Sequence, residues 1–198
     1  VSLLNAMIGL LDFQAARWTI DHEVPEQAGN DHPTSIPTGV FQTADGYMNI
    51  AAGGNEMYGR LCKALGLEHL IDKPEYKDSK ARSANRAALN KDLQEAMVKQ
   101  TSAYWSARFE AGGVAGGPIY KMNEVFADPQ VQHLQAAAKV NHPTLGEFQI
   151  VNQAVKLSRT PASMVRATPE QGEHTDEILA EMGYSAAQIA EFHAAKVV

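Results

Sequence analysis

An Asp-Gly turn between two short runs of strand-forming residues is the feature that most constrains how this chain can fold. The runs are residues 40–43 and 47–52, and Ala44-Asp45-Gly46 joins them. Aspartate and glycine favour tight turns, and a short loop that contains them between two such runs is a strong local signal for an antiparallel hairpin. The sequence therefore predicts a β-hairpin here.

The second run leads directly into a glycine pair and a helical pattern. Gly53 and Gly54 precede Asn55, a residue type that is favoured at helix N-caps, and Gly66 follows the last apolar position as a C-terminal stop. A strand, a glycine pair and a helix N-terminus can together bind an anion through backbone amides. The spacing does not match Gly-x-Gly-x-x-Gly and no Walker lysine follows, so a turn without a ligand is an equal alternative.

Further elements follow along the chain, each with its own local signal. Apolar residues recur at helical spacing in several segments, and a second pair of strand-forming runs flanks another turn. The predicted helices cover residues 87–98, the segment from Ser102, as N-cap, to Gly112, the region near 122–126 and the residues after Asp128-Pro129, and the second hairpin covers 139–142 and 147–151. The segment 113–120 is too rich in glycine for a central strand and is expected to form a close crossing or a short edge strand. Together these elements predict an α+β body.

Residues 68–83 are predicted to form a solvated loop. Pro74 interrupts the segment, and Lys80 and Arg82 are interleaved with acids such as Glu75 and Asp78. Alternating signs favour a solvated surface over a phosphate-binding patch, which needs clustered cations.

The first residues of the chain predict a helix outside this body. Apolar residues from Leu3 to Trp18 recur every three or four positions, and the helical pattern continues to about His22. Residues 23–37 then contain several prolines and read as an extended linker. A helix with an apolar stripe needs a surface to pack on, and this sequence offers none next to it.

The last residues predict two more helices outside the body. They follow a second proline-containing linker over residues 160–170. Thr175 is expected to cap the first of these helices, and Gly183 to end it. Ser185 and Gln188 have the spacing of a capping box and predict the start of the last helix.

Charge, cysteine content and hydropathy exclude several classes of function. The formal net charge of −6 argues against a nucleic acid or an anionic membrane as partner, because those surfaces need clustered Lys and Arg. Cys62 is the only cysteine, so no intrachain disulfide and no cysteine-based metal site is possible, and its apolar neighbours predict a core position. No apolar run is long enough to span a membrane and the first residues lack a secretory signal, so we expect a cytoplasmic, reducing location.

The residues alone do not point to catalysis within this chain. No Gly-x-Ser-x-Gly elbow is present, the seven histidines form no His-Glu-x-x-His motif, and no spacing singles out a pair of carboxylates. We therefore predict no catalytic residue, no metal ligand and no permanently bound cofactor in this chain.

Several short motifs nevertheless occur in a fixed order along nearly the whole sequence. They are Gly29-Asn30-x-His32-Pro33, Pro37-x-Gly39-x-Phe41-x-Thr43-x-Asp45-Gly46, Gly113-Val114-x-x-Gly117-Pro118, Asp128-Pro129-Gln130 and Gly172-Glu173-His174-Thr175-Asp176-Glu177. Each is weak by itself, and Glu173 and His174 alone read as ordinary polar residues at a helix start. In this order and spacing the chain resembles the family III CoA-transferases, which include formyl-CoA transferase, carnitine CoA-transferase and 2-methylacyl-CoA racemase.

The resemblance implies acyl-CoA chemistry. In the transferases of this family an aspartate carboxylate attacks the thioester of an acyl-CoA, and the CoA thiolate opens the resulting mixed anhydride to give an aspartyl-CoA thioester. A carboxylic acid then takes the CoA, so acyl-CoA and a carboxylic acid are the expected partners and coenzyme A is a substrate. In the racemase branch an aspartate and a histidine instead move the proton next to the thioester carbonyl.

The resemblance also implies that this chain is the C-terminal part of such an enzyme. The family's catalytic aspartate lies in an N-terminal Rossmann-like domain, and no aspartate here falls on its motif, which agrees with a chain that begins at Val1 without methionine. The implied domains are residues 1–38 and 161–198, which belong to the large domain, and a small α+β domain over residues 39–160. Family members form interlocked homodimers, with the active site between large and small domains.

The resemblance assigns four candidate substrate-binding residues. Gly53, Gly54 and Asn55 fall where family members place a loop near the acyl group, and Glu56 falls near a glutamate that approaches the catalytic histidine in racemase-like members. An ordinary first-turn acid is the alternative for Glu56. A CoA-transferase is the leading hypothesis, with a racemase of the same fold and a non-catalytic binding or assembly module as the alternatives.

Overall fold

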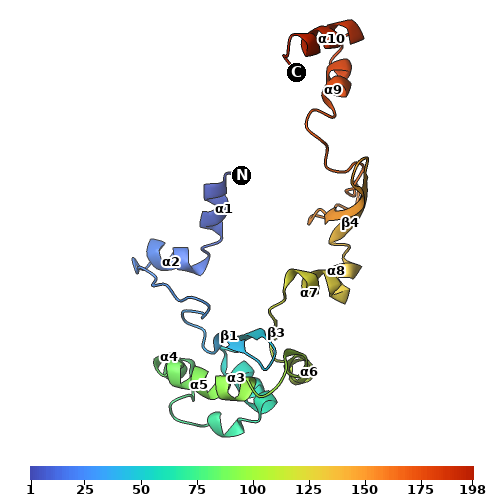
Figure 1. The fold of residues 1–198 in the computed structure, drawn as a ribbon. Coiled ribbons are helices and arrows are strands. Elements are labelled where there is room, and N and C mark those ends of the chain that lie inside the picture. The colour runs from blue at the N-terminus through green and yellow to red at the C-terminus, as the bar shows by residue number, and fades with distance from the viewer. The chain divides into compact units, whose positions relative to one another are not determined.

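The computed structural model describes residues 1–198, and its contacts divide the chain into two units, Val1–Ile119 and Tyr120–Val198 (Figure 1). The first unit contains a three-stranded sheet in the order β1-β2-β3, and the second contains the two-stranded sheet β4-β5. The chain combines ten α-helices with these small antiparallel sheets, so the α+β class predicted from the sequence is confirmed. The predicted domains 1–38, 39–160 and 161–198 stay a prediction.

The predicted hairpin forms the sheet of the first unit. Strands β1 (Thr38–Gln42) and β2 (Tyr47–Ala51) pair antiparallel, and Phe41 lies opposite Met48. Both of these side chains are buried, as is that of Ile50. At the free edge of β1, the side-chain amide of Gln94 donates to the carbonyl of Gln42 (2.8 Å) and accepts from its amide (2.9 Å), so this edge is covered by a side chain.

The glycine-rich segment forms the other edge of this sheet, as predicted. Strand β3 (Gly116–Pro118) pairs with β2 through Asn49 and its neighbours. A Cβ atom on Gly116 would lie 2.9 Å from the carbonyl oxygen of Asn49 and 3.3 Å from a ring carbon of Phe109. Glycine is therefore required here by a close approach of backbone to backbone.

Three helices of the first unit, which Figure 1 labels, bury their apolar faces in its core. They are α3 (Asn55–Leu65), α5 (Arg86–Met97) and α6 (Ser102–Gly112). Their buried side chains include Leu61, Cys62, Leu89, Leu93, Trp105 and Phe109. The core position predicted for Cys62 is confirmed. Thr101 and not Ser102 is the N-cap of α6, because the Thr101 side chain accepts from the amide of Tyr104.

The prediction of a solvated loop over residues 68–83 is wrong. The segment contains a 3-10 turn (Glu68–Leu70) and helix α4 (Ser79–Ala84), which Asp78 caps by accepting from the amide of Ala81 (2.8 Å). Arg82 within α4 is completely buried. The alternating charges predicted a solvated surface. Arg82 instead donates hydrogen bonds to acceptors in other segments of the chain, which the pattern of charges does not reveal.

The prediction of one long N-terminal helix is also wrong. Two short helices, α1 (Leu3–Gly9) and α2 (Phe13–Thr19), are separated at Asp12, whose φ of 45° is left-handed. Aspartate is enriched among the uncommon non-glycine residues that have a positive φ. The apolar side chains of α1 stay largely exposed, with Leu3 at 88%. The linker predicted over residues 23–37 is confirmed, since it contains no helix or strand.

The second unit begins with two short helices and a hairpin. Asp128 ends α7 (Met122–Ala127) and caps α8 (Pro129–His133) by accepting from the amides of Gln130 and Val131. Strands β4 (Ala137–His142) and β5 (Gly146–Val151) confirm the second predicted hairpin and extend it by a few residues. None of the helices in the chain is long and apolar enough to cross a membrane.

The last two helices are α9 (Thr175–Glu181) and α10 (Ala186–Ala194). Thr175 does not cap α9, contrary to prediction. His174 occupies the cap position without a side-chain bond, because Thr175 already has helical geometry. The capping box of Ser185 and Gln188 is confirmed.

Asp45 ties the β1–β2 turn to the start of α6. Its Oδ1 accepts hydrogen bonds from the amide of Ser102 (2.8 Å) and the hydroxyl of Thr43 (3.0 Å). The Ser102 amide is the main cause of a pKa for Asp45 below its usual value, and the hydroxyls of Ser102 and Thr43 act in the same direction. The sequence Thr43-x-Asp45-Gly46 therefore has a structural role in this fold.

Asp45→Asn is expected to lower the melting temperature by a few degrees at pH 7. Folding lowers the pKa of Asp45, so its contribution is fully present above the unfolded-state pKa of about 4 and is lost as the pH falls through the folded-state pKa. The difference between the two proteins should therefore disappear in acid, as thermal melts from pH 7 to pH 3 would show. Asp72→Asn is the control, because this exposed carboxylate makes no hydrogen bond or ion pair. Parallel stability curves for Asp45→Asn and the unmutated chain would contradict this role.

Gly116→Ala is expected to destabilise the chain by about 1–3 kcal/mol, because the new methyl group overlaps the Asn49 carbonyl. The neighbouring Gly117→Ala is the matched control, since a Cβ atom there meets no other atom within 4 Å. Denaturant unfolding of both variants measures the difference. Equal stabilities would show that the edge strand does not need glycine at residue 116.

Candidate functional site

The four candidate substrate-binding residues lie where β2 ends and α3 begins. Gly53 and Gly54 form the connection, and Asn55 and Glu56 are the first two residues of α3. The amide of Ala52 donates to the carbonyl of Pro37 (2.8 Å), which fixes the start of this connection beside residues 35–37. We call residues 53–56 the glycine loop.

Gly53 is packed against the preceding segment. A Cβ atom on Gly53 would overlap the hydroxyl of Ser35, so no side chain fits at this position. The carbonyl of Gly53 accepts a hydrogen bond from Nη2 of Arg82 (2.7 Å). This end of the glycine loop is therefore fixed by contacts within the chain.

Gly54 has an open environment. It is the N-cap residue of α3, with φ −75° and ψ 154°, and makes no side-chain cap. A Cβ atom here would meet nothing within 4 Å, and these dihedral angles suit any residue. Neither the backbone conformation nor the packing of this chain therefore explains why glycine occupies this position. The start of α3 has no side-chain cap and carries the partial positive charge of a helix N-terminus.

Asn55 does not cap α3, contrary to prediction. It is the first helical residue, and its Oδ1 accepts from Nη2 of Arg82 (2.9 Å). The residue that sequence reasoning missed is therefore Arg82, which contacts both ends of the Gly53–Asn55 segment.

Each nitrogen of the Arg82 guanidinium donates to at least one uncharged acceptor. Nε donates to the carbonyl of Ile36 (2.9 Å) and Nη1 to the carbonyl of Tyr76 (3.1 Å), in addition to the two bonds from Nη2. The guanidinium carbon lies 4.6 Å from the centre of the Tyr58 ring, which adds a cation–π contact. Burial lowers the pKa of Arg82 from its ordinary value, and its charge persists because that value is far above neutral.

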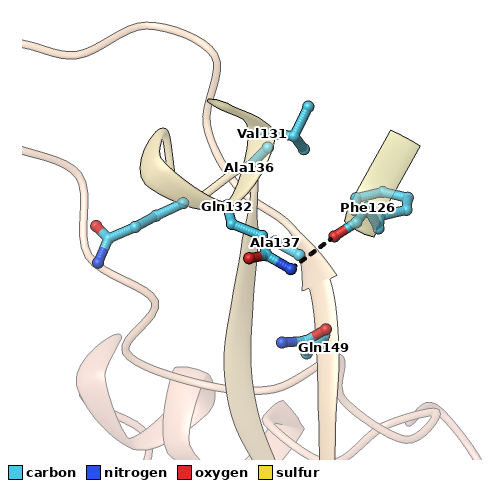
Figure 2. Close-up of a pocket in the computed structure, with 7 residues that line it drawn as sticks. Phe126, Val131, Gln132, Ala136, Ala137 and Gln149 are labelled. Carbon is cyan, nitrogen blue, oxygen red and sulfur yellow. Dashed lines mark hydrogen bonds between the residues drawn. The ribbon is translucent and has the colours of Figure 1, made fainter. Parts of the chain in front are cut away.

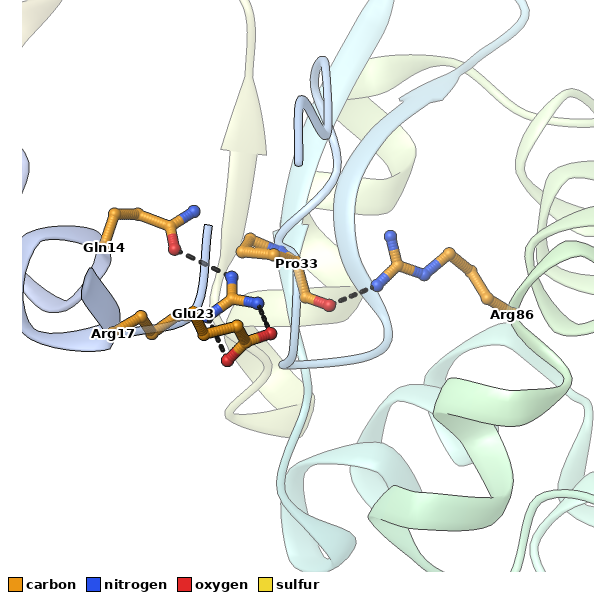
Figure 3. Close-up of polar contacts among 5 residues, drawn as sticks. All are labelled: Gln14, Arg17, Glu23, Pro33 and Arg86. Carbon is orange, nitrogen blue, oxygen red and sulfur yellow. Dashed lines mark hydrogen bonds and ion pairs between the residues drawn. The ribbon is translucent and has the colours of Figure 1, made fainter. Parts of the chain in front are cut away.

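A sequence signal for Arg82 does exist. Arg82 and Arg86 lie seven residues before Leu89 and Leu93, respectively, so in the sequence they fall on the same helical stripe as these two buried leucines. Arg86 is also turned inward, and its Nη2 donates to the carbonyls of His32 (3.1 Å) and Pro33 (2.7 Å) (Figure 3). Helical spacing, rather than the alternation of charges, would have identified both arginines.

Glu56 lies on the exposed side of α3. Its carboxylate pairs with Nη2 of Arg60 one turn later (2.5 Å), and 81% of its side chain is exposed. Arg60 also donates to the carbonyl of Gly113 (3.3 Å). These contacts fit the interpretation of Glu56 as a first-turn acid, and a position near substrate stays a prediction for all four residues.

The core beneath the glycine loop does not offer an activated nucleophile. Burial raises the pKa of the Cys62 thiol and that of the Tyr58 hydroxyl, which donates to the carbonyl of Leu70 (3.1 Å). Both groups are therefore neutral near pH 7. No group of three or more His, Cys, Asp or Glu side chains is arranged to hold a metal ion.

Polar side chains also line hollows elsewhere in the chain, including one in each unit. In the first unit, Arg17 and Arg86 line a hollow in which Arg17 pairs with Glu23 and also donates to Gln14 (2.9 Å) (Figure 3). The Arg17 guanidinium lowers the pKa of Glu23, and the pair neutralises itself. In the second unit, a pocket between α8 and the β4–β5 hairpin is lined by Phe126, Val131, Gln132, Gln135, Ala136, Ala137 and Gln149 (Figure 2). Its polar groups are amides, which do not act as acids or bases near pH 7.

Comparisons with known proteins agree with the motifs. The model of CoA-transferase family III matches residues 1–175. The chain is 36% identical to the succinyl-CoA:glutarate CoA-transferase of Homo sapiens, over 100% of this chain and 45% of the relative. It is 30% identical to the succinate–glutarate CoA-transferase of Agrobacterium fabrum, over 92% of this chain and 46% of the relative.

A solved structure gives the same result. The fold matches a CAIB/BAIF family protein from Brucella suis with a TM-score of 0.74 and 29% identity, covering 87% of this chain and 44% of that one. The chain thus spans less than half the length of the relatives that it matches. The family model nevertheless covers most of the sequence, so the resemblance drawn from the motifs is confirmed, and the chain belongs to CoA-transferase family III.

Proposed function

We propose that this chain is the small domain, with flanking segments, of an enzyme that moves CoA from an acyl-CoA thioester to a carboxylic acid. Membership of CoA-transferase family III supports this proposal. Two curated relatives are named for transfer between succinate and glutarate, so we propose succinyl-CoA as donor and a dicarboxylic acid as acceptor. CoA is then a substrate that enters and leaves in each turnover.

We place the nucleophilic aspartate outside these 198 residues. Several aspartates of the chain already have structural partners. Asp45 holds a turn, Asp78 and Asp128 cap helices, and Asp176 pairs with His193 (2.7 Å). A carboxylate that attacks a thioester must instead be free to form a covalent bond in a pocket.

The glycine loop is the part of this chain that we propose to face the thioester. The single observation that carries this proposal is the contrast between its two glycines. Packing fixes Gly53 against Ser35, whereas Gly54 has open space in front of it and no requirement for glycine within this chain. A substrate that passes close to the backbone explains the absence of a side chain at Gly54, and the uncapped amides of α3 suit a thioester oxygen that gains negative charge.

The two ends of the chain support the proposed assignment to a large domain. Leu3 and Leu4 in the first segment and Val165 and Ile178 in the last have exposed side chains. Clustered apolar residues at the surface of a chain usually mark contact with another domain or subunit. We propose that segments 1–38 and 161–198 pack on the large domain and that the complete enzyme is an interlocked homodimer.

The complete protein, which joins this chain to the part of its relatives' length that it does not span, is expected to transfer CoA from succinyl-CoA to glutarate. Chromatography of the CoA esters would detect the product. The chain alone is expected to be inactive, because it lacks the nucleophile. Transfer by these 198 residues alone would contradict that placement.

The same complete protein distinguishes the two alternative functions. Exchange of the α-proton of a 2-methylacyl-CoA in deuterated water, without CoA transfer, would identify a racemase. The absence of both reactions would favour a non-catalytic binding module.

Gly54→Ser is expected to lower kcat/KM of the complete enzyme about tenfold or more, because the new side chain enters the open space and displaces the substrate. Folding should not suffer, since serine suits an N-cap at least as well as glycine. Gly59→Ala, inside α3, is the control, because its Cβ also meets nothing within 4 Å. Steady-state kinetics that are unchanged in Gly54→Ser would remove the glycine loop from the active site.

A further inference from the structure

Arg82 is the fully buried charged side chain of this chain, with no exposed surface. A guanidinium is expensive to bury unless its N–H groups are hydrogen-bonded, so the identity of its acceptors shows what its burial fixes. These acceptors belong to three separate segments, namely Ile36, Tyr76 and the Gly53–Asn55 part of the glycine loop.

One nitrogen of Arg82 binds the glycine loop at two points. Nη2 donates to the Gly53 carbonyl (2.7 Å) and to the Asn55 side chain (2.9 Å), and these residues flank Gly54 on both sides. From the same planar group, Nε reaches the Ile36 carbonyl (2.9 Å). The guanidinium therefore sets the distance between the glycine loop and the segment around Ile36.

The geometry of this contact requires arginine. A guanidinium is a rigid planar fork, whereas an ammonium is a point charge on a flexible stem with no fixed plane. The Tyr58 ring lies 4.6 Å from the guanidinium carbon and limits its movement. Lysine at this position could satisfy some of the acceptors but could not hold the two segments at one fixed separation.

We propose that Arg82 is a positioning residue, which holds the glycine loop against residues 35–37 so that Gly54 keeps a fixed place over the reacting thioester. This inference rests on the proposed function. The mixed anhydride and the thioester that form in such an enzyme react readily with water, so a loop beside them must keep its position while they exist. Arg82 itself does not touch the substrate and acts from behind the loop.

The first test is amide hydrogen exchange on this chain. The amide of Ala52 donates to Pro37 and that of Tyr58 donates to Gly54, so these two amides report on both ends of the loop. Arg82→Lys should speed their exchange about tenfold, while amides in β1 and α6 keep their rates. Arg86→Lys is the matched control, because Arg86 also binds backbone carbonyls of the linker but none in the glycine loop. Unchanged exchange at both amides would overturn the proposal.

The second test is the ratio of succinyl-CoA hydrolysis to CoA transfer in the complete enzyme. After the spontaneous hydrolysis measured without enzyme is subtracted, this ratio does not depend on how much of a variant is folded, so a lower folded fraction leaves it unchanged. We expect Arg82→Lys to raise it several-fold and Arg86→Lys to leave it as in the unmutated enzyme. A ratio that stays constant in Arg82→Lys would overturn the positioning role.

A second pair of variants, at Asn55, tests the proposal if the protein does not fold with a substitution at Arg82. Asn55→Ala removes one acceptor from Nη2 and should raise the hydrolysis ratio, whereas Asn55→Asp keeps an acceptor and should restore it. Equal ratios in Asn55→Ala and Asn55→Asp would overturn the proposal. An unmutated complete enzyme without transferase activity would instead refute the proposed function, and hydrogen exchange alone would then decide whether Arg82 holds the loop.

Discussion

A buried cation without an acidic partner is the interaction on which the first unit depends. Arg82 donates to three backbone carbonyls and one side-chain amide oxygen, so its partners are dipoles. Such an arrangement requires that every acceptor be correctly placed, because a missing acceptor leaves a charged donor without compensation in the core. We therefore expect three segments to fold together, namely the linker before β1, the turn around Tyr76 and the glycine loop. A shift of any one of them would remove a hydrogen bond from the buried Arg82 guanidinium.

The motifs that define this family in the sequence have mostly structural explanations. Gly39 leaves room for the side chain of Asp31, and Gly53 for that of Ser35. Asp45 connects the hairpin to α6. These residues hold β1, β2 and the linker in one arrangement, and Gly54 is the residue of the glycine loop that this arrangement does not explain.

Local signals were sufficient to predict most of the elements, because turns, caps and edge strands depend on a few adjacent residues. The hairpin around Asp45, the capping box at Ser185 and the edge strand at Gly116 are examples. The sequence did not predict the contacts of Arg82, whose acceptors lie up to 46 residues away. The sequence also did not predict the helix break at Asp12, because the apolar spacing continues across this residue although its φ is positive. The candidate loop came from family resemblance, whereas the hydrogen bonds that connect Arg82 to this loop were found only in the structure.

The proposed division of tasks within the enzyme follows from these contacts. A reactive carboxylate must be free to move through covalent states, whereas the aspartates in this chain that cap helices and hold turns are fixed. A loop that covers such intermediates has the opposite requirement, because small displacements admit water. Placing the nucleophile on one domain and the covering loop on another lets each satisfy its own requirement. In this proposal, the contribution of this chain to that separation is the attachment of the glycine loop to the core by the hydrogen bonds of Arg82.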